Sequence, residues 1–325
     1  MFRGVRPEGH ARLKWIEQYT AEHPKAVLLD PIDKVANVIN RVTTLKLLTE
    51  AYWKYGAAGG MPRPPRFVVY EDKKGEPNAG LDFQPPWGHL AFPVICKPID
   101  ACGTRGSHTM IVVLDEAGMN DLKPPIVVQE YSNHAGKLFK VFVVGDEVRV
   151  HERSSLPDLS PELVGSFTFV SQKAYPTLAQ IGAITEATAR TRGPSRTLLR
   201  KRKPGNVTNA SPLPRPVEIC FDLMPTPSSV PSTTKAGRVN EASMPPSLSL
   251  EVARVAARRM RETFGLTIFG FDLIVDVTSG ELMVIDVNYF PSFKDLADFP
   301  QELRRRLRDV AAAARVGPDE GQGTS

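Results

Sequence analysis

The chain has 325 residues, of which 42% are hydrophobic and 24% charged, and its formal net charge is +5. This composition is ordinary for a globular protein of one large or two modest domains. No run of about 18 apolar residues occurs, and the N-terminal MFRGVRPEGHARLKW lacks the apolar core of a secretory signal, so we expect neither a membrane span nor secretion.

Cysteine and charge patterns restrict the compartment and the partners. The three cysteines, Cys96, Cys102 and Cys220, have no metal-ligand spacing and cannot form a disulfide framework, so we expect a reducing compartment, the cytoplasm. The basic RKRK at 200–203 leaves a nuclear location open. The excess positive charge suits an anionic partner but does not by itself indicate nucleic acid.

The first half of the chain alternates between helical and strand-like patterns. Residues 11–23 and 32–52 predict helices, and the apolar run Val27–Leu29 between them predicts a short buried strand. A Gly/Pro-rich loop at 56–65 follows. Strands are then predicted at 66–72, 92–98 and 125–131, and a hairpin at 137–155, which turns at Gly145-Asp146.

The second half begins with a segment of different composition. Residues 177–247 are rich in Pro, Ser, Thr and Arg, and most of this segment predicts a long loop or a disordered insertion. A helix is predicted at 248–264, with Gly265 as its C-cap. Two strands within 269–291, separated by TSGE, and a helix at 296–315 follow. Mixed helices and strands make the fold α/β, or α+β.

Three polar residues stand within the last two predicted strands. Asp272, Asp286 and Asn288 interrupt apolar runs, and residues 286 and 288 point to the same face of a strand. Two buried carboxylates must share a proton or bind a cation. Oxygen ligands of this kind suit Mg²⁺. The alternative is that Asp272 caps a turn while Asp286 and Asn288 begin a loop.

Cationic residues occur near the ends of the earlier strands. Lys97 closes an apolar run, so it must be paired or face a cleft, where it can bind phosphate. The polar loop from Gly103 to His108 is of the kind that folds over phosphates. Lys140 and Arg153 lie on the predicted hairpin beside the strand end Gln129–Tyr131. The alternative for each of these residues is an ordinary solvated position.

Several of these segments together resemble a known family. FPVICKP, GTRGSHTM, VVQEYSNHAGKLFKVFVVGDEVRVHERSSLPDL and FGFDLIV…VIDVNYFPSF resemble the inositol tetrakisphosphate 1-kinase (inositol 1,3,4-trisphosphate 5/6-kinase) family, most closely its plant-type members. The resemblance covers about residues 16–175 and 248–300. It implies an ATP-grasp fold, in which two α+β subdomains grip ATP between them.

The resemblance also implies roles for individual residues. Asp286, Asn288 and Lys140 would be catalytic, and Asp272, Asp286 and Asn288 would bind two Mg²⁺ ions. Inositol phosphate would contact His108, Lys140, Arg153, Asn288 and Ser292. The residues implied to contact ATP are Arg41, Lys97, Gln129, Glu130, Tyr131, Lys140, Ser155 and Ser171, with the adenine near Glu130 and Tyr131.

Domain boundaries follow from the resemblance and the composition. We expect a remnant of an N-terminal inositol-phosphate-binding region at 1–60, the central ATP-grasp lobe at 61–176 and the basic insertion at 177–247. The C-terminal lobe with the metal site would span 248–315, and 316–325 would be a polar tail. Family members carry a substrate-binding lysine in an earlier region that has no counterpart here. They also have glycine where this chain has Ser292, which bears on substrate fit.

The resemblance implies an ATP- and Mg²⁺-dependent inositol polyphosphate kinase, active as a monomer. Its substrate would be inositol 1,3,4-trisphosphate, at the 5- or 6-hydroxyl, or inositol 3,4,5,6-tetrakisphosphate, at the 1-hydroxyl. Two alternatives remain open. One is an ATP-grasp ligase that activates a carboxylate. The other is a catalytically weak protein that binds nucleotide or inositol phosphate.

Overall fold

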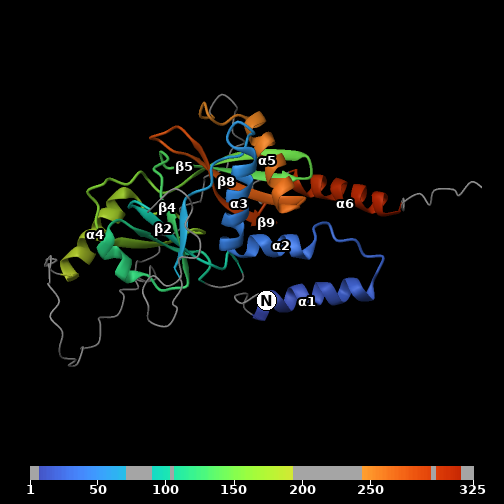
Figure 1. Ribbon diagram of the computed structural model, residues 1–325, viewed down its shortest axis with the longest axis horizontal. Helices are drawn as coiled ribbons and strands as arrows, with labels where there is room; N and C mark the ends of the chain where they lie inside the picture. Colours follow the sequence, from blue (N-terminus) through green and yellow to red (C-terminus); the bar gives the residue numbers. More distant parts are fainter. Residues whose placement is uncertain (1–6, 71–89, 103–105, 193–243, 294–297, 316–325) are drawn as a thin grey trace, which may run out of the picture.

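Two antiparallel β-sheets flanked by helices make up the protein (Figure 1). The computed structural model describes residues 7–70, 90–102, 106–192, 244–293 and 298–315. Within these ranges no helix is long and apolar enough to cross a bilayer.

The first sheet has five strands, in the order β1-β4-β2-β3-β7. Its strands are β1 (Phe67–Tyr70), β2 (Val94–Pro98), β3 (Thr109–Val113), β4 (Ile126–Glu130) and β7 (Ser166–Val170), and a 3-10 helix, η1 (Glu116–Asp121), lies between β3 and β4. This confirms the strands predicted near 66–72, 92–98 and 125–131. Helix α4 (Leu178–Arg192) packs on this sheet through Ile181, which shares a buried cluster with Phe167 and Phe169.

The second sheet has four strands, in the order β6-β5-β8-β9. They are β5 (Lys137–Val144), β6 (Glu147–Ser154), β8 (Ile268–Val275) and β9 (Leu282–Tyr289), which confirms the predicted hairpin and the two predicted C-terminal strands. The hairpin β5–β6 pairs with β8, so strand pairing crosses the predicted boundary between lobes 61–176 and 248–315.

Alternation along β8 gives the second sheet two unlike faces. Phe269, Phe271 and Leu273 are fully buried on one face, where helices α3 (Arg41–Tyr55) and α5 (Leu250–Phe264) cover them. Each such buried side chain contributes about 1.5–3 kcal/mol of hydrophobic stabilisation. Asp272 alternates with these residues and therefore lies on the other face. The acids interrupt the apolar strand pattern because they belong to the face that is not the core.

Helix α5 begins and ends where the sequence predicts. Ser249 caps its start, with Oγ accepting a hydrogen bond from the Val252 amide. Gly265 ends it at φ 65°, in the left-handed region, and its amide donates to the Arg261 carbonyl, so the predicted C-cap is confirmed. The predicted C-terminal helix is also present, as α6 (Phe299–Arg315).

The predictions for the N-terminal part need two corrections. The expected helix at 32–52 is two helices, α2 (Ile32–Ile39) and α3, because Asn40 is extended and its side chain caps α3 by accepting from Val42 and Thr43. The strand expected at Val27–Leu29 is absent from the described residues, and Val27 is 54% exposed. The preceding helix, α1 (Pro7–Glu22), confirms the helix predicted at 11–23.

The predicted insertion needs a correction as well. The segment 177–247 begins with the ordered helix α4, which was expected to be loop. Residues 193–243, including RKRK, and the tail 316–325 lie outside the described residues.

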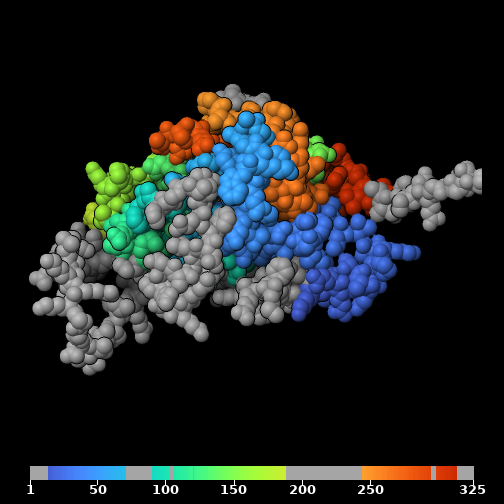
Figure 2. Space-filling model, viewed as in Figure 1, coloured from blue at the N-terminus to red at the C-terminus, as the bar shows by residue number. Residues whose placement is uncertain are grey.

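Figure 2 shows α3 and the chain after it, in lighter blue, filling the middle of one face between the teal and green region and the orange C-terminal region.

Candidate active site

Asp272 and Asp286 are directly opposite each other in the antiparallel pair β8–β9. Opposite residues in such a pair have Cβ atoms about 4.5–5.5 Å apart, so both carboxylates share one face. Asn288, two residues after Asp286, donates from Nδ2 to Asp286 Oδ2 at 2.9 Å. The three residues singled out from the sequence therefore converge, and the alternative of a separate turn cap and loop start is wrong, because Asp272, Asp286 and Asn288 all lie within strands.

Lys140 completes a row of charged groups across three strands. It is the β5 partner of Asp272, and its Nζ lies 3.6 Å from Asp272 Oδ1. Two residues along β8 stands Gly270, where a Cβ would come within 2.9 Å of the Pro291 ring and 3.0 Å of the Val141 carbonyl. Because residue 270 is glycine, Pro291 can pack against the strand beside Asn288, which is the cross-strand partner of Gly270.

The two carboxylates form a site that suits a divalent cation. Burial raises the pKa of Asp272, the negative charge of Asp286 raises it further, and Lys140 opposes the shift. Asp272 Oδ1 is buried and has no hydrogen-bond partner among the described residues. Two carboxylates and an amide are oxygen donors of the type that Mg²⁺ prefers. Asp272, Asp286 and Asn288 are thus fitted to hold it.

Lys97 reaches the acidic face from the other sheet. It lies on β2, is fully buried, and donates from Nζ to the Ile285 carbonyl on β9 at 2.9 Å. Burial lowers its pKa to about 8, while the negative charge of Asp286 opposes that shift. Lys97 therefore links the two sheets beside Asp286, and its proton is held loosely for a lysine.

Arg41 is a buried support for the loop after β2. Its guanidinium donates to the carbonyls of Pro98 at 2.7 Å, Asp100 at 2.8 Å and Ser107 at 3.1 Å. Burial lowers its pKa, and Asp286 opposes this effect. The resemblance assigned Arg41 to ATP phosphates. In the structure three of its hydrogen bonds hold the backbone on either side of 103–105, which lie outside the described residues.

His108, just before β3, and Ser171, just after β7, are hydrogen-bonded to each other through the main chain. The Ser171 amide donates to the His108 carbonyl at 2.9 Å. Burial lowers the pKa of His108, followed by the positive charge of Arg41, while Asp286 raises it. Arg41, Lys97 and His108, which were predicted from separate segments, all lie within electrostatic range of Asp286.

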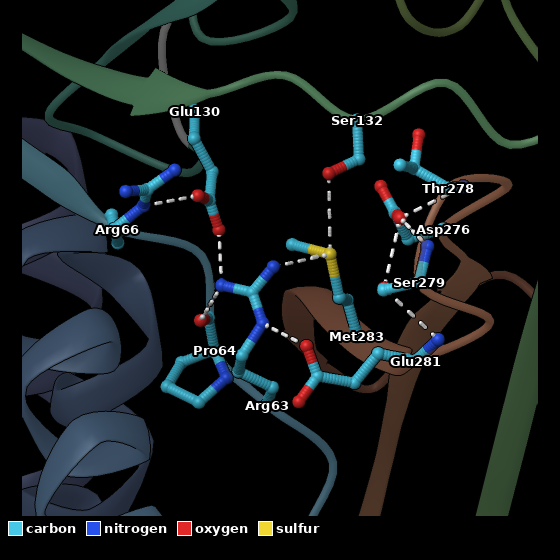
Figure 3. Close-up of polar contacts among 10 residues, drawn as sticks. All are labelled: Arg63, Pro64, Arg66, Glu130, Ser132, Asp276, Thr278, Ser279, Glu281 and Met283. Atoms are coloured by element: carbon cyan, nitrogen blue, oxygen red, sulfur yellow. Dashed lines mark hydrogen bonds and ion pairs between the residues drawn. The ribbon is translucent and has the colours of Figure 1, made fainter. Parts of the chain in front are cut away.

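The predicted adenine segment contains a charge network that the sequence did not reveal (Figure 3). Gln129 and Glu130 are buried at the end of β4, and both oxygens of the Glu130 carboxylate are bound by arginines. Arg63 contacts Oε1, and Arg66 contacts Oε2 at 2.6 Å. Tyr131 follows, its hydroxyl donating to the Pro157 carbonyl at 3.3 Å. The Glu130 side chain is therefore already neutralised by the protein.

Ser155 is bound to a histidine that the sequence interpretation passed over. His134 Nε2 lies 2.8 Å from Ser155 Oγ, and His134 Nδ1 lies 2.7 Å from the Ser132 carbonyl oxygen. Since a carbonyl only accepts, Nδ1 carries the proton and Nε2 accepts from the Ser155 hydroxyl. Burial lowers the pKa of His134, which favours this neutral form. The lone pairs of Ser155 Oγ are thus directed away from His134.

Tyr175 is a second residue that the sequence interpretation missed. It lies shortly after β7, and burial, together with the charges of Asp272 and Asp286, raises its pKa to about 12. Its ring packs against Phe169, with the ring centroids 5.6 Å apart, and its hydroxyl is within electrostatic range of both acids. No local motif marks Tyr175, because the acids that raise its pKa lie on strands about 100 residues later in the chain.

The remaining predicted substrate residues are placed less centrally. Arg153 is on β6 opposite Leu138, in the same sheet as Lys140. Its positive charge lowers the pKa of Tyr175, which places it toward the acidic face. Ser292 is exposed between the buried Pro291 and Phe293, just after β9. The structure thus brings Arg153 toward the site and leaves Ser292 at its margin.

Comparison with protein families gives a direct match. Residues 57–200 and 220–309 match the model described as "Inositol 1,3,4-trisphosphate 5/6-kinase ATP-grasp domain". The match includes most of the predicted insertion 177–247 and leaves only 201–219 of it outside. The gap between the two matched parts thus lies inside the expected insertion.

Relatives from plants and a vertebrate agree with this match. The chain is 29% identical over 298 residues to inositol-tetrakisphosphate 1-kinase 1 of Arabidopsis thaliana, covering 91% of this chain and 76% of that protein. It is 29% identical to inositol-tetrakisphosphate 1-kinase 2 of Glycine max, with the same coverage. It is 26% identical to inositol-tetrakisphosphate 1-kinase of Danio rerio, covering 91% of this chain and 60% of that protein. The chain belongs to the inositol 1,3,4-trisphosphate 5/6-kinase family and contains its ATP-grasp domain.

Proposed function

We propose that this protein transfers the terminal phosphoryl group of ATP to a hydroxyl of an inositol polyphosphate. The observation that carries the proposal is the acidic pair Asp272–Asp286, with Lys140 beside it on the same sheet and Lys97 reaching it from the other. Phosphoryl transfer depends on positioning and on neutralising phosphate charge, and this arrangement supplies both.

The side chains divide the work by position. Asp272, Asp286 and Asn288 would hold Mg²⁺, two ions by our proposal, which neutralises the phosphates of ATP when bound. Lys97, when protonated, binds a phosphate oxygen. Lys140 favours the ionised form of Asp272 and adds positive charge where the transferred group passes. Tyr175 donates a hydrogen bond to whatever anion occupies the face.

The nucleotide and the acceptor would contact two adjoining sets of residues, which meet where Ser171 binds His108. Gln129–Tyr131, Ser155 and Ser171 form our proposed nucleotide side, with the base near the end of β4. His108 and Arg153, with Lys140 and Asn288, form the proposed acceptor side. A polyphosphorylated ring needs positive charge and hydrogen-bond donors at several edges; Lys140 and Arg153 supply the charge, and His108 and Asn288 supply donors. The names of the relatives and of the family model make inositol tetrakis- and trisphosphates the acceptors to test first.

The test is a phosphoryl-transfer screen with the purified full chain, ATP and Mg²⁺. We expect transfer to inositol 1,3,4-trisphosphate or inositol 3,4,5,6-tetrakisphosphate, with the product position read by NMR. Transfer to no inositol phosphate would overturn the proposal. ADP release that requires a carboxylate plus an amine would instead support the ligase alternative, and thermal stabilisation by ligand without turnover would support a binding protein.

A further inference from the structure

Arg63 joins the two sheets through both its backbone and its side chain. Its amide donates to the Leu282 carbonyl and its carbonyl accepts from the Val284 amide, each at 3.0 Å. These bonds form a parallel bridge to Met283, so Arg63 extends the second sheet at the outer edge of β9. Its position relative to β9 is therefore fixed by the main chain.

The Arg63 side chain crosses from this edge to the first sheet (Figure 3). One guanidinium nitrogen contacts Glu130 at the end of β4, and Nε donates to Glu281 at the start of β9 at 2.7 Å. A third nitrogen lies 3.0 Å from Met283 Sδ. The planar fork of arginine suits two carboxylates at a set separation, which a lysine cannot span.

We propose that Arg63 is a positioning residue for the nucleotide. By binding Glu130 and Glu281 together, it fixes the end of β4 against β9 and so sets the place of residues 130–132, where the base of ATP would bind. The inference rests on the proposed function and adds to it the residue that shapes the base end of the nucleotide site.

Residues 132 and 133 are also held against β9 and the β8–β9 turn by contacts that do not involve Arg63. Ser132 Oγ donates to Met283 Sδ at 3.3 Å, and the Asn133 carbonyl accepts from the Val277 amide at 2.9 Å in the β8–β9 turn. These contacts are neutral. Arg63 supplies the charge-assisted contacts, which are about twice as strong.

Arg66 provides a matched comparison within the same network. It binds the other oxygen of Glu130 through Nε at 2.6 Å, but it lies next to β1, and its carbonyl accepts from the Glu130 amide at 2.9 Å. Both arginines neutralise one carboxylate, whereas only Arg63 reaches Glu281 and β9. If charge neutralisation were the whole role, the two arginines would be interchangeable.

The experiment measures ADP binding by calorimetry, and KM for ATP and for inositol phosphate, in R63Q, R63K and R66Q. We expect R63Q to weaken ADP binding about tenfold, as loss of hydrogen bonds to charged groups predicts. R63K should recover only part of this loss. KM for ATP should rise in parallel, while KM for inositol phosphate and kcat stay within about twofold of the unaltered chain. R66Q should change ADP binding by less than about threefold, because its contact stays within one sheet.

A double variant separates positioning from stability. R63Q leaves Glu130 with one arginine, so it should lower the melting temperature, and R63Q/E130Q should restore that temperature by removing the charge. We expect ADP binding to stay weak in R63Q/E130Q. Recovery of ADP binding in this variant, equal effects of R63Q and R66Q, or unchanged ADP binding in R63Q would each overturn the inference, as would absence of ADP binding by the unaltered chain. ADP binding without phosphoryl transfer would count against the proposed function alone.

Discussion

Asp272 and Asp286 are cross-strand partners on the polar face of the β8–β9 pair, and Asp286 accepts a hydrogen bond from Asn288 while Asp272 lies beside Lys140. This pairing creates like-charge repulsion at a half-buried place, which the protein alone relieves only in part. A cation or a proton relieves the rest. The site is therefore built for a ligand at some expense of stability, as binding sites commonly are.

Replacing one acid tests this balance directly. We expect Asp272→Asn to reduce phosphoryl transfer about 100-fold or more, because it removes a ligand for the ion that neutralises phosphate charge. The fold should survive with an unchanged or higher melting temperature, since asparagine resembles the neutral acid that burial favours. Initial rates and thermal melts without metal check this. A lower melting temperature with an unchanged rate would mean that Asp272 is structural.

Lys97 gives opposite pH trends for binding and stability. Its pKa is about 8 in the folded protein against 10.5 ordinarily. Between pH 8 and pH 10.5 the unfolded chain binds more protons than the folded protein does. The contribution of Lys97 to stability therefore grows as the pH rises through this range and is lost as the pH falls through 8. The cation that binds phosphate disappears over the same range. KM for ATP should therefore rise above pH 8 while the free energy of unfolding increases.

Two variants serve as controls for the Lys97 trends. Lys97→Met should remove both pH trends. Lys97→Arg should keep KM for ATP constant above pH 8, since arginine stays charged. Denaturant unfolding and ATP kinetics across this pH range provide the measurements. The same pH trends in Lys97→Met as in the unaltered chain would assign the titration to another group.

The acidic face could be predicted from the sequence because its signal is local. Asp286 and Asn288 keep a two-residue spacing inside an apolar strand, and Gly145-Asp146 marks the hairpin that carries Lys140. The family resemblance added the order of the segments. Strand type and the position of the acids were therefore readable before any contact was known.

Other features could not be predicted because their causes are distant or subtle. Arg63 lies in a Pro-rich loop, and its partners Glu130 and Glu281 are 67 and 218 residues away. The break at Asn40 was missed because apolar periodicity continues through it, while a side-chain cap decides the boundary. The apolar run at Val27 reads as a strand, yet nothing pairs with it in the described residues.

The His134–Ser155 contact predicts coupled effects on nucleotide binding. Ser155→Ala and His134→Ala should each raise KM for ATP several-fold, because His134 orients the Ser155 hydroxyl through the 2.8 Å contact. The double variant should be little worse than either single one, since one substitution removes the Ser155 hydroxyl and the other removes the group that orients it. ATP kinetics on the three variants measure the coupling. Additive effects would show that His134 and Ser155 act independently.

Ser292→Gly tests whether substrate fit is limited at the margin of the site. Phe290 has a positive φ of 43°, whereas Ser292 is not among the described non-glycine residues with positive φ, so its backbone does not require glycine. Because Ser292 is exposed, the substitution should change the free energy of unfolding by no more than about 0.5 kcal/mol.

Removing the Ser292 side chain allows closer approach of a ligand to the backbone. We expect KM for inositol phosphate to fall several-fold while KM for ATP stays the same. A higher KM for inositol phosphate in Ser292→Gly would show instead that the serine hydroxyl binds the substrate.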